Sequence, residues 1–539
     1  MRTERKCALL LASMGPLLLP VNAQVVFSEV FQGPYIDHFH SVFATADNGN
    51  VFCGNTFDAM SQWDGVVTKL TSNGAEQWNL TIGIGGNSEE LQDVIETQSG
   101  DLVAIGSTTS FSAFATREMW IVRISPTGSL IWSERYPNGT GTDEDGWRIV
   151  ELPAGELMAL SGYVSHGRLT KLTATGTVVW SKSYGTTPLT YMGFNDLTRL
   201  SNGNLALAGT AAGTGQWSGV NRGILAEVDT SGAVLWWKEY GDMDFTQFMA
   251  VKQLVGNGGS EHADLVVCGI HMPSAVTYTD SLLVARLTDS GDLLWAKVIP
   301  ASRGLDLEIG PTGYDGVLVA GANYDAADSS LLVLSVDGSG TLQWGRSISL
   351  PGLNNWEIGR GICRNVDGTY TTAGSALFPP PGWGYHGGYA VRFNDPTPAS
   401  ACWEPTSHAL VPIPMPMIIP SYTVTNPAVQ DIAAPTTTGM TLQLTDTYCT
   451  TVGVNETEQH TTLLAIPTVT SDMLTLTYTG LDKPLRVDVV DADGRSVGVP
   501  LSAGRSETIM DVRGLAEGVY SAQLRWASGS QTVRFVVAR

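Results

Sequence analysis

The side chains that could bind a metal ion are few and scattered. His38 and His40 are two residues apart and would point the same way along a strand, while His271 and His386 fall in long loops. No H-E-x-x-H or paired-cysteine motif accompanies them. The run Asp143-Glu144-Asp145 lacks EF-hand spacing and is better explained as a solvated acidic loop. We therefore expect neither a metal site nor a cofactor.

The cysteines divide into two groups. Cys402 and Cys449 bracket a segment rich in proline and threonine, and in an oxidising compartment they would form a disulfide; two free thiols are the alternative. Cys53, Cys268 and Cys363 lie within apolar runs typical of strands, where a free cysteine behaves as a small core residue.

The middle of the chain repeats two short patterns. A G-x-x-x-W pattern occurs six times, as in SNGAEQW and DSGDLLW, and its tryptophans are 48 to 59 residues apart: Trp78, Trp132, Trp180, Trp236, Trp295 and Trp344. A strand-like run ending at glycine, as in VAIG and LVAG, occurs seven times: Gly54, Gly106, Gly162, Gly209, Gly269, Gly321 and Gly374. The sequence thus contains seven copies of one structural unit.

Each unit contains four short strands. In the second unit these are LQDVIETQ, DLVAIGST, MWIVRISP and SLIWSERY, with tight Asx-Gly or Ser-Gly turns inside the first and second pairs. Four-stranded units of about 40 to 50 residues are typical of β-propeller blades. We predict an all-β, seven-bladed propeller over residues 24–395, in which the repeated tryptophan packs between neighbouring blades.

The start of this region predicts how the ring closes. VVFSEVFQ aligns with the fourth strand of the other units, and Phe27 takes the place of the tryptophan. The N-terminal strand would complete the seventh blade, whose other three strands lie within 358–393, and so remove exposed sheet edges. A β-helix or a row of separate sheets would not explain an isolated fourth strand at the start. The G-x-x-x-W pattern resembles the repeats of quinoprotein-like propellers and of long Bacteroidetes surface proteins, although the vicinal cysteine pair of the cofactor-binding quinoproteins is missing.

The first 23 residues are typical of an export signal. Arg2, Arg5 and Lys6 precede an apolar core, and small residues allow cleavage between Ala23 and Gln24. No later stretch reaches the roughly 20 apolar residues of a membrane-spanning helix, so we expect no transmembrane segment in the mature chain. The net charge of −22 argues against nucleic acid as a partner, because such a surface repels phosphate backbones.

Residues 459–539 form a second β-rich region. Ile466-Pro467, Asp493-Gly494 and the LAEGVY run that contains Gly518 and Tyr520 keep the order and spacing of a known motif. They resemble the type A C-terminal sorting domain of type IX secretion cargo in Bacteroidetes, although only the first proline of the usual Tyr-Pro-Asn-Pro opening is present. The resemblance implies a small β-sandwich, the type IX machinery as partner and a location outside the cell or on its surface. An adhesive Ig-like module is the alternative. Residues 396–458 would be a linker with a short β unit.

Long loops between the strands carry several aromatic residues. In a propeller, the loops between strands two and three and between blades share one face, where aromatic side chains provide contact area. The candidates for a recognition face are Trp63, Phe111, Tyr191, Trp217, Tyr278, Trp383 and Tyr385. Alternatively, these rings fold back and hold their own loops.

The sequence contains no G-x-S-x-G elbow and no glycine-rich phosphate loop. We therefore expect a non-enzymatic module on the cell surface that binds an extracellular glycan or protein, or serves as a scaffold. The alternative is a secreted hydrolase of extracellular polysaccharide, with acidic residues near the central channel, because propellers also house glycosidases.

Overall fold

The structure of the chain is a computed structural model with two compact units, residues 1–451 and 452–539. It describes residues 25–447 and 463–538, with the following gaps: 33–36, 58–61, 84–86, 111–115, 138–140, 164–165, 187–190, 213–219, 242–243, 255–262, 274–279, 311–314, 326–327, 349–357, 379–384, 395–402, 406–409, 413–414, 416, 419–421, 426–431, 434–442, 467–468, 471, 479–483, 485, 491–495, 504–506 and 527–528.

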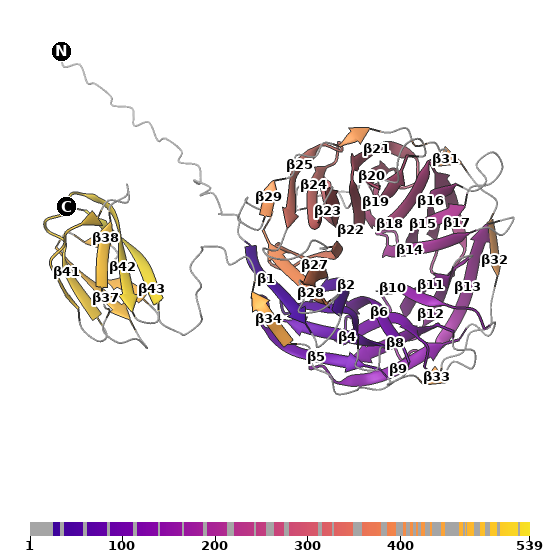
Figure 1. The fold of residues 1–539 in the computed structure, drawn as a ribbon, viewed down its shortest axis with the longest axis horizontal. Helices are drawn as coiled ribbons and strands as arrows, with labels where there is room; N and C mark the ends of the chain where they lie inside the picture. Colours follow the sequence, from indigo (N-terminus) through magenta and orange to yellow (C-terminus); the bar gives the residue numbers. More distant parts are fainter. Residues whose placement is uncertain are drawn as a thin grey trace, which may run out of the picture. The chain divides into compact units, whose positions relative to one another are not determined.

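The first unit is a seven-bladed β-propeller, as predicted (Figure 1). The first three blades are blade 1 with β2 (Asp37–Ala44), β3 (Asn50–Phe57), β4 (Trp63–Leu70) and β5 (Glu76–Ile82); blade 2 with β6 (Glu89–Glu96), β7 (Leu102–Thr108), β8 (Glu118–Ile124) and β9 (Leu130–Tyr136); and blade 3 with β10 (Asp145–Glu151), β11 (Leu157–Tyr163), β12 (His166–Leu172) and β13 (Val178–Thr186). Each is an antiparallel sheet whose first strand is innermost.

The next three blades repeat this order. They are blade 4 with β14 (Met192–Arg199), β15 (Leu205–Ala212), β16 (Asn221–Val228) and β17 (Val234–Tyr240); blade 5 with β18 (Phe245–Gln253), β19 (Leu265–Met272), β20 (Ser281–Leu287) and β21 (Leu293–Pro300); and blade 6 with β22 (Ser302–Ile309), β23 (Gly316–Asp325), β24 (Asp328–Asp337) and β25 (Leu342–Ile348). We call the face with the tight turns the lower face and the opposite face, where each blade leads to the next, the upper face.

Blade 7 joins the two ends of the ring. Its strands β26 (Ile358–Arg364), β27 (Tyr370–Phe378) and β28 (Tyr385–Phe393) are followed in the sheet by the N-terminal β1 (Val25–Gln32). β1 pairs antiparallel with β28, and Glu29 lies opposite Ala390. The strand order therefore confirms the prediction that the N-terminal strand closes the ring.

Phe27 and five of the six repeated tryptophans pack against a turn glycine of the following blade, whereas Trp344 of blade 6 meets Phe393 of blade 7. Trp78 of blade 1 lies over Gly128 of blade 2, where an added Cβ would come within 2.7 Å of the indole ring. Phe27 of blade 7 meets Gly74 of blade 1 at 2.8 Å in the same way. These glycines have positive φ, +82° at Gly128, because they end the tight turn between the third and fourth strands. Within one copy of the G-x-x-x-W pattern, the glycine thus contacts the preceding blade and the tryptophan contacts the following blade, as Gly74 and Trp78 of blade 1 do.

A tyrosine four residues after some of these tryptophans strengthens the contact. The hydroxyl of Tyr136 donates to the carbonyl of Gly176 at 2.8 Å, and that of Tyr184 donates to Gly232 at 2.9 Å. Tyr240 donates to Gly291 at 2.6 Å. The same ring therefore fills space between blades and satisfies a turn carbonyl of the next blade.

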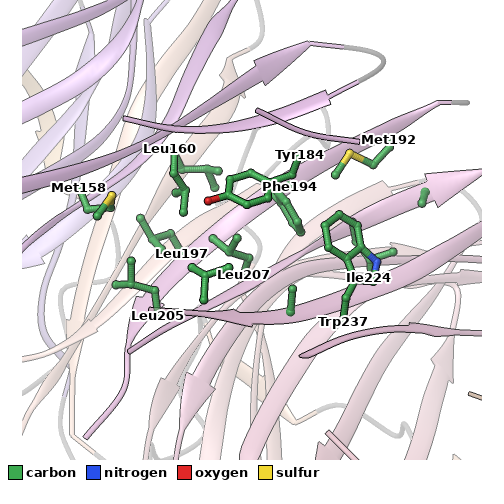
Figure 2. Close-up of a cluster of buried hydrophobic side chains, with 14 of the residues drawn as sticks. Met158, Leu160, Tyr184, Met192, Phe194, Leu197, Leu205, Leu207, Ile224 and Trp237 are labelled. Atoms are coloured by element: carbon green, nitrogen blue, oxygen red, sulfur yellow. The ribbon is translucent and has the colours of Figure 1, made fainter. Parts of the chain in front are cut away.

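Apolar side chains fill the rest of the space between blades. Figure 2 shows the cluster between blades 3 and 4, where Leu160 and Tyr184 of blade 3 face Phe194 and Leu207 of blade 4. All four are 2% exposed or less. Because the sheets pack face to face in this way, both faces of the inner strands are buried and their sequences are almost continuously apolar.

Six short strands between residues 403 and 447 form a belt around the outside of the propeller (Figure 1, orange). Each pairs antiparallel with the outermost strand of one blade, and the belt passes the blades in the order 6, 5, 4, 3, 2 and 7. The strands are β29 (Trp403–Pro405), β30 (Val411–Pro412), β31 (Met417–Ile418), β32 (Tyr422–Thr425), β33 (Ile432–Ala433) and β34 (Gln443–Thr447). Blade 1 has no fifth strand among the described residues.

The belt differs from the linker with its own short β unit that we predicted for 396–458. The outer strands of the blades expose unpaired backbone groups, and the segment is long enough to pair with six of them rather than with itself. Met415, between β30 and β31, is 5% exposed and packs in the cluster between blades 4 and 5 near Trp236. The belt is therefore part of the propeller. Cys402 and Cys449, which flank it in sequence, lie outside the described residues, and their disulfide stays a prediction.

The second unit is a small sandwich of two sheets. One contains β35 (Leu463–Ile466), β37 (Met473–Tyr478), β40 (Leu501–Ala503) and β41 (Glu507–Asp511). The other contains β36 (Val469–Thr470), β38 (Arg486–Val490), β39 (Ser496–Val497), β42 (Gly518–Trp526) and β43 (Gly529–Val537). Leu476 and Met510 of the first sheet share a core with Val489 and Phe535 of the second. β36 pairs with β43 in parallel, whereas the neighbouring β42 pairs with β43 antiparallel.

The contact between blades predicts a large difference between two turn glycines. Gly128→Ala would add a strained φ and a clash with Trp78, whereas at Gly203, with φ of +88°, no atom lies within 4 Å of an added Cβ. We expect Gly203→Ala to lower the free energy of unfolding by about 1 kcal/mol and Gly128→Ala by a further 1 to 3 kcal/mol, roughly. Urea unfolding measures both, and equal losses would contradict the packing role of the glycine.

The belt predicts that a side chain outside the repeats stabilises the ring. Met415→Ala should lower the free energy of unfolding by about 2 kcal/mol, because it leaves a cavity between two blades. Leu235→Ala is the control, because Leu235 lies on the outer strand of blade 4 and is 52% exposed. It should change the free energy of unfolding by less than about 0.5 kcal/mol. If both variants unfold like the parent chain, the belt does not stabilise the propeller.

Candidate binding site at the mouth of the central channel

A ring of seven side chains lines the middle of the channel. Every innermost strand contains a β-bulge at the same register, for example between Phe39 and Ser41, so that one extra residue per blade turns toward the axis. These residues surround a pocket of about 120 Å³, with Arg148 beside them: His40, Gln92, Trp147, Asn195, Met249, Leu305 and Arg360. No part of this ring was singled out from the sequence except His40.

Below the ring, carboxylates connect neighbouring blades. Asp93, Asp196 and Asp306 follow the bulges of blades 2, 4 and 6, and each accepts a backbone N–H from the next blade: from Ile149 at 3.1 Å, Val251 at 2.7 Å and Ile362 at 2.9 Å. Arg148 Nε is 2.9 Å from Asp196, and its Nη1 is 3.8 Å from Asp93. These groups line a second pocket of about 270 Å³. Their hydrogen bonds make them part of the framework of the channel wall.

Burial and ion pairing act against each other in this wall. Burial raises the pKa of Asp306 to about 6, although the nearby Arg148 and Lys252 lower it. Burial disfavours the charge of Arg148, but Asp93, Asp196 and Asp306 outweigh it and raise the pKa of the guanidinium. Arg148 therefore stays charged in the channel.

Two further carboxylates lie at the upper mouth of the channel. Glu90 and Asp145 precede the bulge residues by two positions, so they lie on the same side of their strands. Burial raises the pKa of Asp145 to about 6, with Arg117 opposing this shift and Glu90 adding to it. Burial also raises the pKa of Glu90, against Arg117 and Arg360. Both carboxylates thus hold protons more tightly than free ones.

Arg117 and Tyr163 extend this mouth onto the upper face. Arg117 Nη2 is 3.1 Å from Asp145 and 3.8 Å from Asp143, and its guanidinium lies 5.5 Å from the centre of the Tyr163 ring. The backbone N–H of Arg117 donates to Asp143 at 2.8 Å, which fixes the loop. Tyr163 remains 37% exposed. We call Glu90, Arg117, Asp143, Asp145 and Tyr163 the rim cluster.

We predicted that the acidic run Asp143-Glu144-Asp145 would be a solvated loop, and the structure shows that this was wrong for Glu144. Glu144 is fully buried and accepts hydrogen bonds from Ser161 at 2.8 Å, while His166 and Arg168 lie at 3.1 and 3.2 Å. Burial raises its pKa, but these partners outweigh burial and the net shift is downward. The carboxylate of Glu144 is therefore paired with side chains of its own blade.

The histidines do not assemble. His38 and His40 share one side of β2, with ring centres 6.2 Å apart, and burial, followed by Arg360, holds the pKa of His40 well below its usual value. His271 and His386 lie within β19 and β28, not in loops as predicted. In the described part of the chain, no three metal-ligating side chains form a group that could hold an ion.

The structure tests few of the predicted recognition residues. Trp63 is half-buried in β4 and packs against Phe57, with ring centres 4.8 Å apart, so it folds back onto its own blade. Tyr191 is 47% exposed, and Tyr385 begins β28. The others lie outside the described residues: Phe111, Trp217, Tyr278 and Trp383. The rim residues Tyr163 and Arg117 were missed, and only the acidic run next to them gave a signal.

Some of the remaining predicted sites can also be placed. Gly518 and Tyr520 lie in β42, where the Tyr520 hydroxyl donates to the carbonyl of Ala516 at 2.9 Å and its ring stacks 5.7 Å from Phe535. Ala23, Gln24, Pro467, Asp493 and Gly494 lie outside the described residues. Cys53, Cys268 and Cys363 are free and buried.

Residues 466–538 match the family described as "Secretion system C-terminal sorting domain". The chain therefore carries a type IX sorting domain after its propeller, and it is secreted to the outer cell surface or the extracellular space. The type IX machinery is the partner that this domain implies. No helix of the described residues is long and apolar enough to cross a membrane.

Comparison with curated proteins finds no match. Among solved structures, the chain is similar to a protein of unknown function from Bacteroides caccae, with 13% identity, 58% of this chain and 94% of that chain covered and a TM-score of 0.34. It is also similar to Sqt1 from Chaetomium thermophilum, with 13% identity, coverage of 65% and 83% and a TM-score of 0.38. Drosophila plexin A in complex with semaphorin 1b gives 9% identity, 69% and 87% coverage and a TM-score of 0.38.

The raised pKa of Asp306 predicts a pH dependence with a definite sign. A carboxyl that holds its proton more tightly when folded stabilises the fold below pH 4, and this stabilisation is lost as the pH rises through about 6. Asp306→Asn keeps an acceptor for Ile362 but does not ionise. Relative to this variant, the parent chain should lose up to about 3 kcal/mol of unfolding free energy between pH 4 and pH 7. A difference that does not change with pH would show that the carboxyl is solvated.

Proposed function

We propose that the exported propeller is a non-enzymatic binding module for an extracellular glycan, recognised at the rim cluster. Residues 1–23 would act as the signal peptide and the chain would come from a Bacteroidetes bacterium, which agrees with the sorting domain. The observation that carries the proposal is the partly exposed Tyr163 ring beside Arg117, Asp143 and Asp145. An aromatic face next to paired charged groups suits a sugar, which has C–H faces and hydroxyl edges.

The ionic contacts of the rim cluster support rigid recognition. Arg117 is held by two carboxylates and by its own backbone N–H bond to Asp143, so Tyr163, the last residue of β11, lies beside a guanidinium in a fixed position. A site that is already ordered loses little conformational entropy on binding. The sorting domain that follows the propeller brings this face to the medium in which glycans occur.

The deeper carboxylates also favour binding over catalysis. Asp93, Asp196 and Asp306 accept backbone N–H groups of neighbouring blades, and Arg148 is shared between two of them. A hydrolase needs a carboxyl free to exchange a proton with its substrate. One observation favours the alternative hydrolase: Glu90 and Asp145 lie on adjacent innermost strands, and both have raised pKa values.

A glycan microarray probed with the full chain tests the proposal. We expect binding to a set of extracellular glycans, a loss of at least about tenfold in Tyr163→Ala and no change in Ile131→Ala, a 50% exposed residue on the outer strand of blade 2. A Tyr163→Ala variant that binds as the parent does would contradict the rim site, and binding to proteins but not to glycans would contradict the ligand class. Shortening of the bound glycan, abolished in Asp145→Asn, would favour the hydrolase.

A further inference from the structure

The bulge ring differs in kind from the repeated contacts between blades. Its seven side chains occupy one equivalent position per blade, yet they are all of different types. At positions that hold the blades together, such as the outer tryptophan and its turn glycine, the same residue recurs. A position that only packed a symmetric ring would have no need for seven chemistries. The variation therefore indicates an asymmetric surface.

Polar and apolar side chains occupy different parts of the ring. Arg360, His40 and Gln92 come from the consecutive blades 7, 1 and 2, respectively. Trp147, Met249 and Leu305 come from blades 3, 5 and 6. The pocket is thus polar on one side and apolar, with an indole ring, on the other. Asn195 of blade 4 and Arg148, which follows Trp147 in blade 3, are the polar residues that line the apolar side.

The hydrogen bonds of the ring leave both donors and acceptors toward the axis. His40 Nδ1 lies 2.9 Å from the carbonyl oxygen of Leu91, which can only accept, so Nδ1 carries the proton and the neutral ring keeps an acceptor at Nε2. Asn195 Nδ2 donates to the carbonyl of Phe248 at 2.7 Å, which leaves its side-chain oxygen as an acceptor. Arg360 supplies donors. Hydroxyl groups, which donate and accept, match such a surface.

The charges around the pocket largely cancel. Arg148 is balanced by Asp93 and Asp196, and Arg360 lies close enough to Glu90 to lower the pKa of that carboxyl. An anionic ligand would compete with these carboxylates for the two arginines. The size is also restrictive: the pocket, with a volume of about 120 Å³, is enclosed by the seven innermost strands, so it admits a single small group rather than a polymer chain.

We propose that the bulge ring binds one uncharged sugar residue, the terminal residue of the glycan, with its C–H face against Trp147 and its hydroxyls toward His40, Gln92 and Arg360. This site lies directly below the rim cluster, because Asp145 and Trp147 are two residues apart in β10. The inference rests on the proposed function and deepens it. The rim cluster would bind the inner sugar residues of the glycan, and the bulge ring would bind its terminal residue.

Saturation-transfer NMR on the full chain with methyl glycosides tests the site. The probes are the methyl glycosides of glucose, galactose, mannose and N-acetylglucosamine, with methyl glucuronide as the charged comparison. We expect at least one neutral glycoside to bind, and its affinity to fall at least tenfold in Trp147→Ala and in Met249→Trp, which fills the pocket. Ile131→Ala, far from the channel, should bind as the parent chain does.

The variants must first show the circular dichroism spectrum of the parent chain, which confirms that they fold. Met249→Trp reduces the volume of the pocket, whereas Trp147→Ala increases it. If the parent chain binds array glycans but neither variant loses affinity for the glycosides, the channel site is wrong and the rim site stands. Preference for methyl glucuronide would overturn the assignment of an uncharged sugar. If the parent chain binds no array glycan, the proposed function itself fails.

Discussion

The structure depends on one contact that recurs around the ring, an aromatic side chain of one blade seated on a turn glycine of the next. Neither partner can change alone. A Cβ on the glycine would enter the indole ring, and a smaller side chain would leave a gap between two sheets. Because blades 1 to 5 each provide the aromatic residue for one neighbour and the glycine for the other, none of them is complete by itself. Phe27 brings the N-terminal strand into the same system.

The belt follows from the geometry that this contact creates. Radial packing leaves the fourth strand of every blade as an unpaired edge, and exposed edges promote association with other chains. Six short strands of the same chain pair with six of these edges. One of them, β34, pairs with β1, so the strand that closes the ring is internal to its sheet. Protection of this kind suits a protein that works outside the cell.

The repeats could be predicted from the sequence because every blade packs against neighbours of the same architecture. Tight turns, strand alternation and the tryptophan therefore return at the same register, and even ring closure was visible through Phe27. The belt was not visible, since strands of two to five residues show no period of two and their partners are distant in sequence. The Pro and Thr composition indicated a linker, but Pro405 and Pro412 lie in belt strands at a sheet edge, where proline is tolerated.

The site was harder to predict than the fold, because function uses the positions at which the blades differ. A β-bulge has no sequence signature here, so the seven channel residues could not be aligned in advance. Trp147 gave a weak signal, as a tryptophan outside the repeat register. Tyr163 ends β11 directly after the repeated Gly162, and its contact with Arg117 joins residues that are distant in the sequence.

Native-state hydrogen exchange of the full chain tests the closed ring most directly. If β1 completes blade 7 under the belt, the amide protons that link β1 to β28 should exchange as slowly as those that link the third and fourth strands of the other six blades. Exchange of β1 and β28 at the rate of a free edge, while the other blades stay protected, would contradict the account.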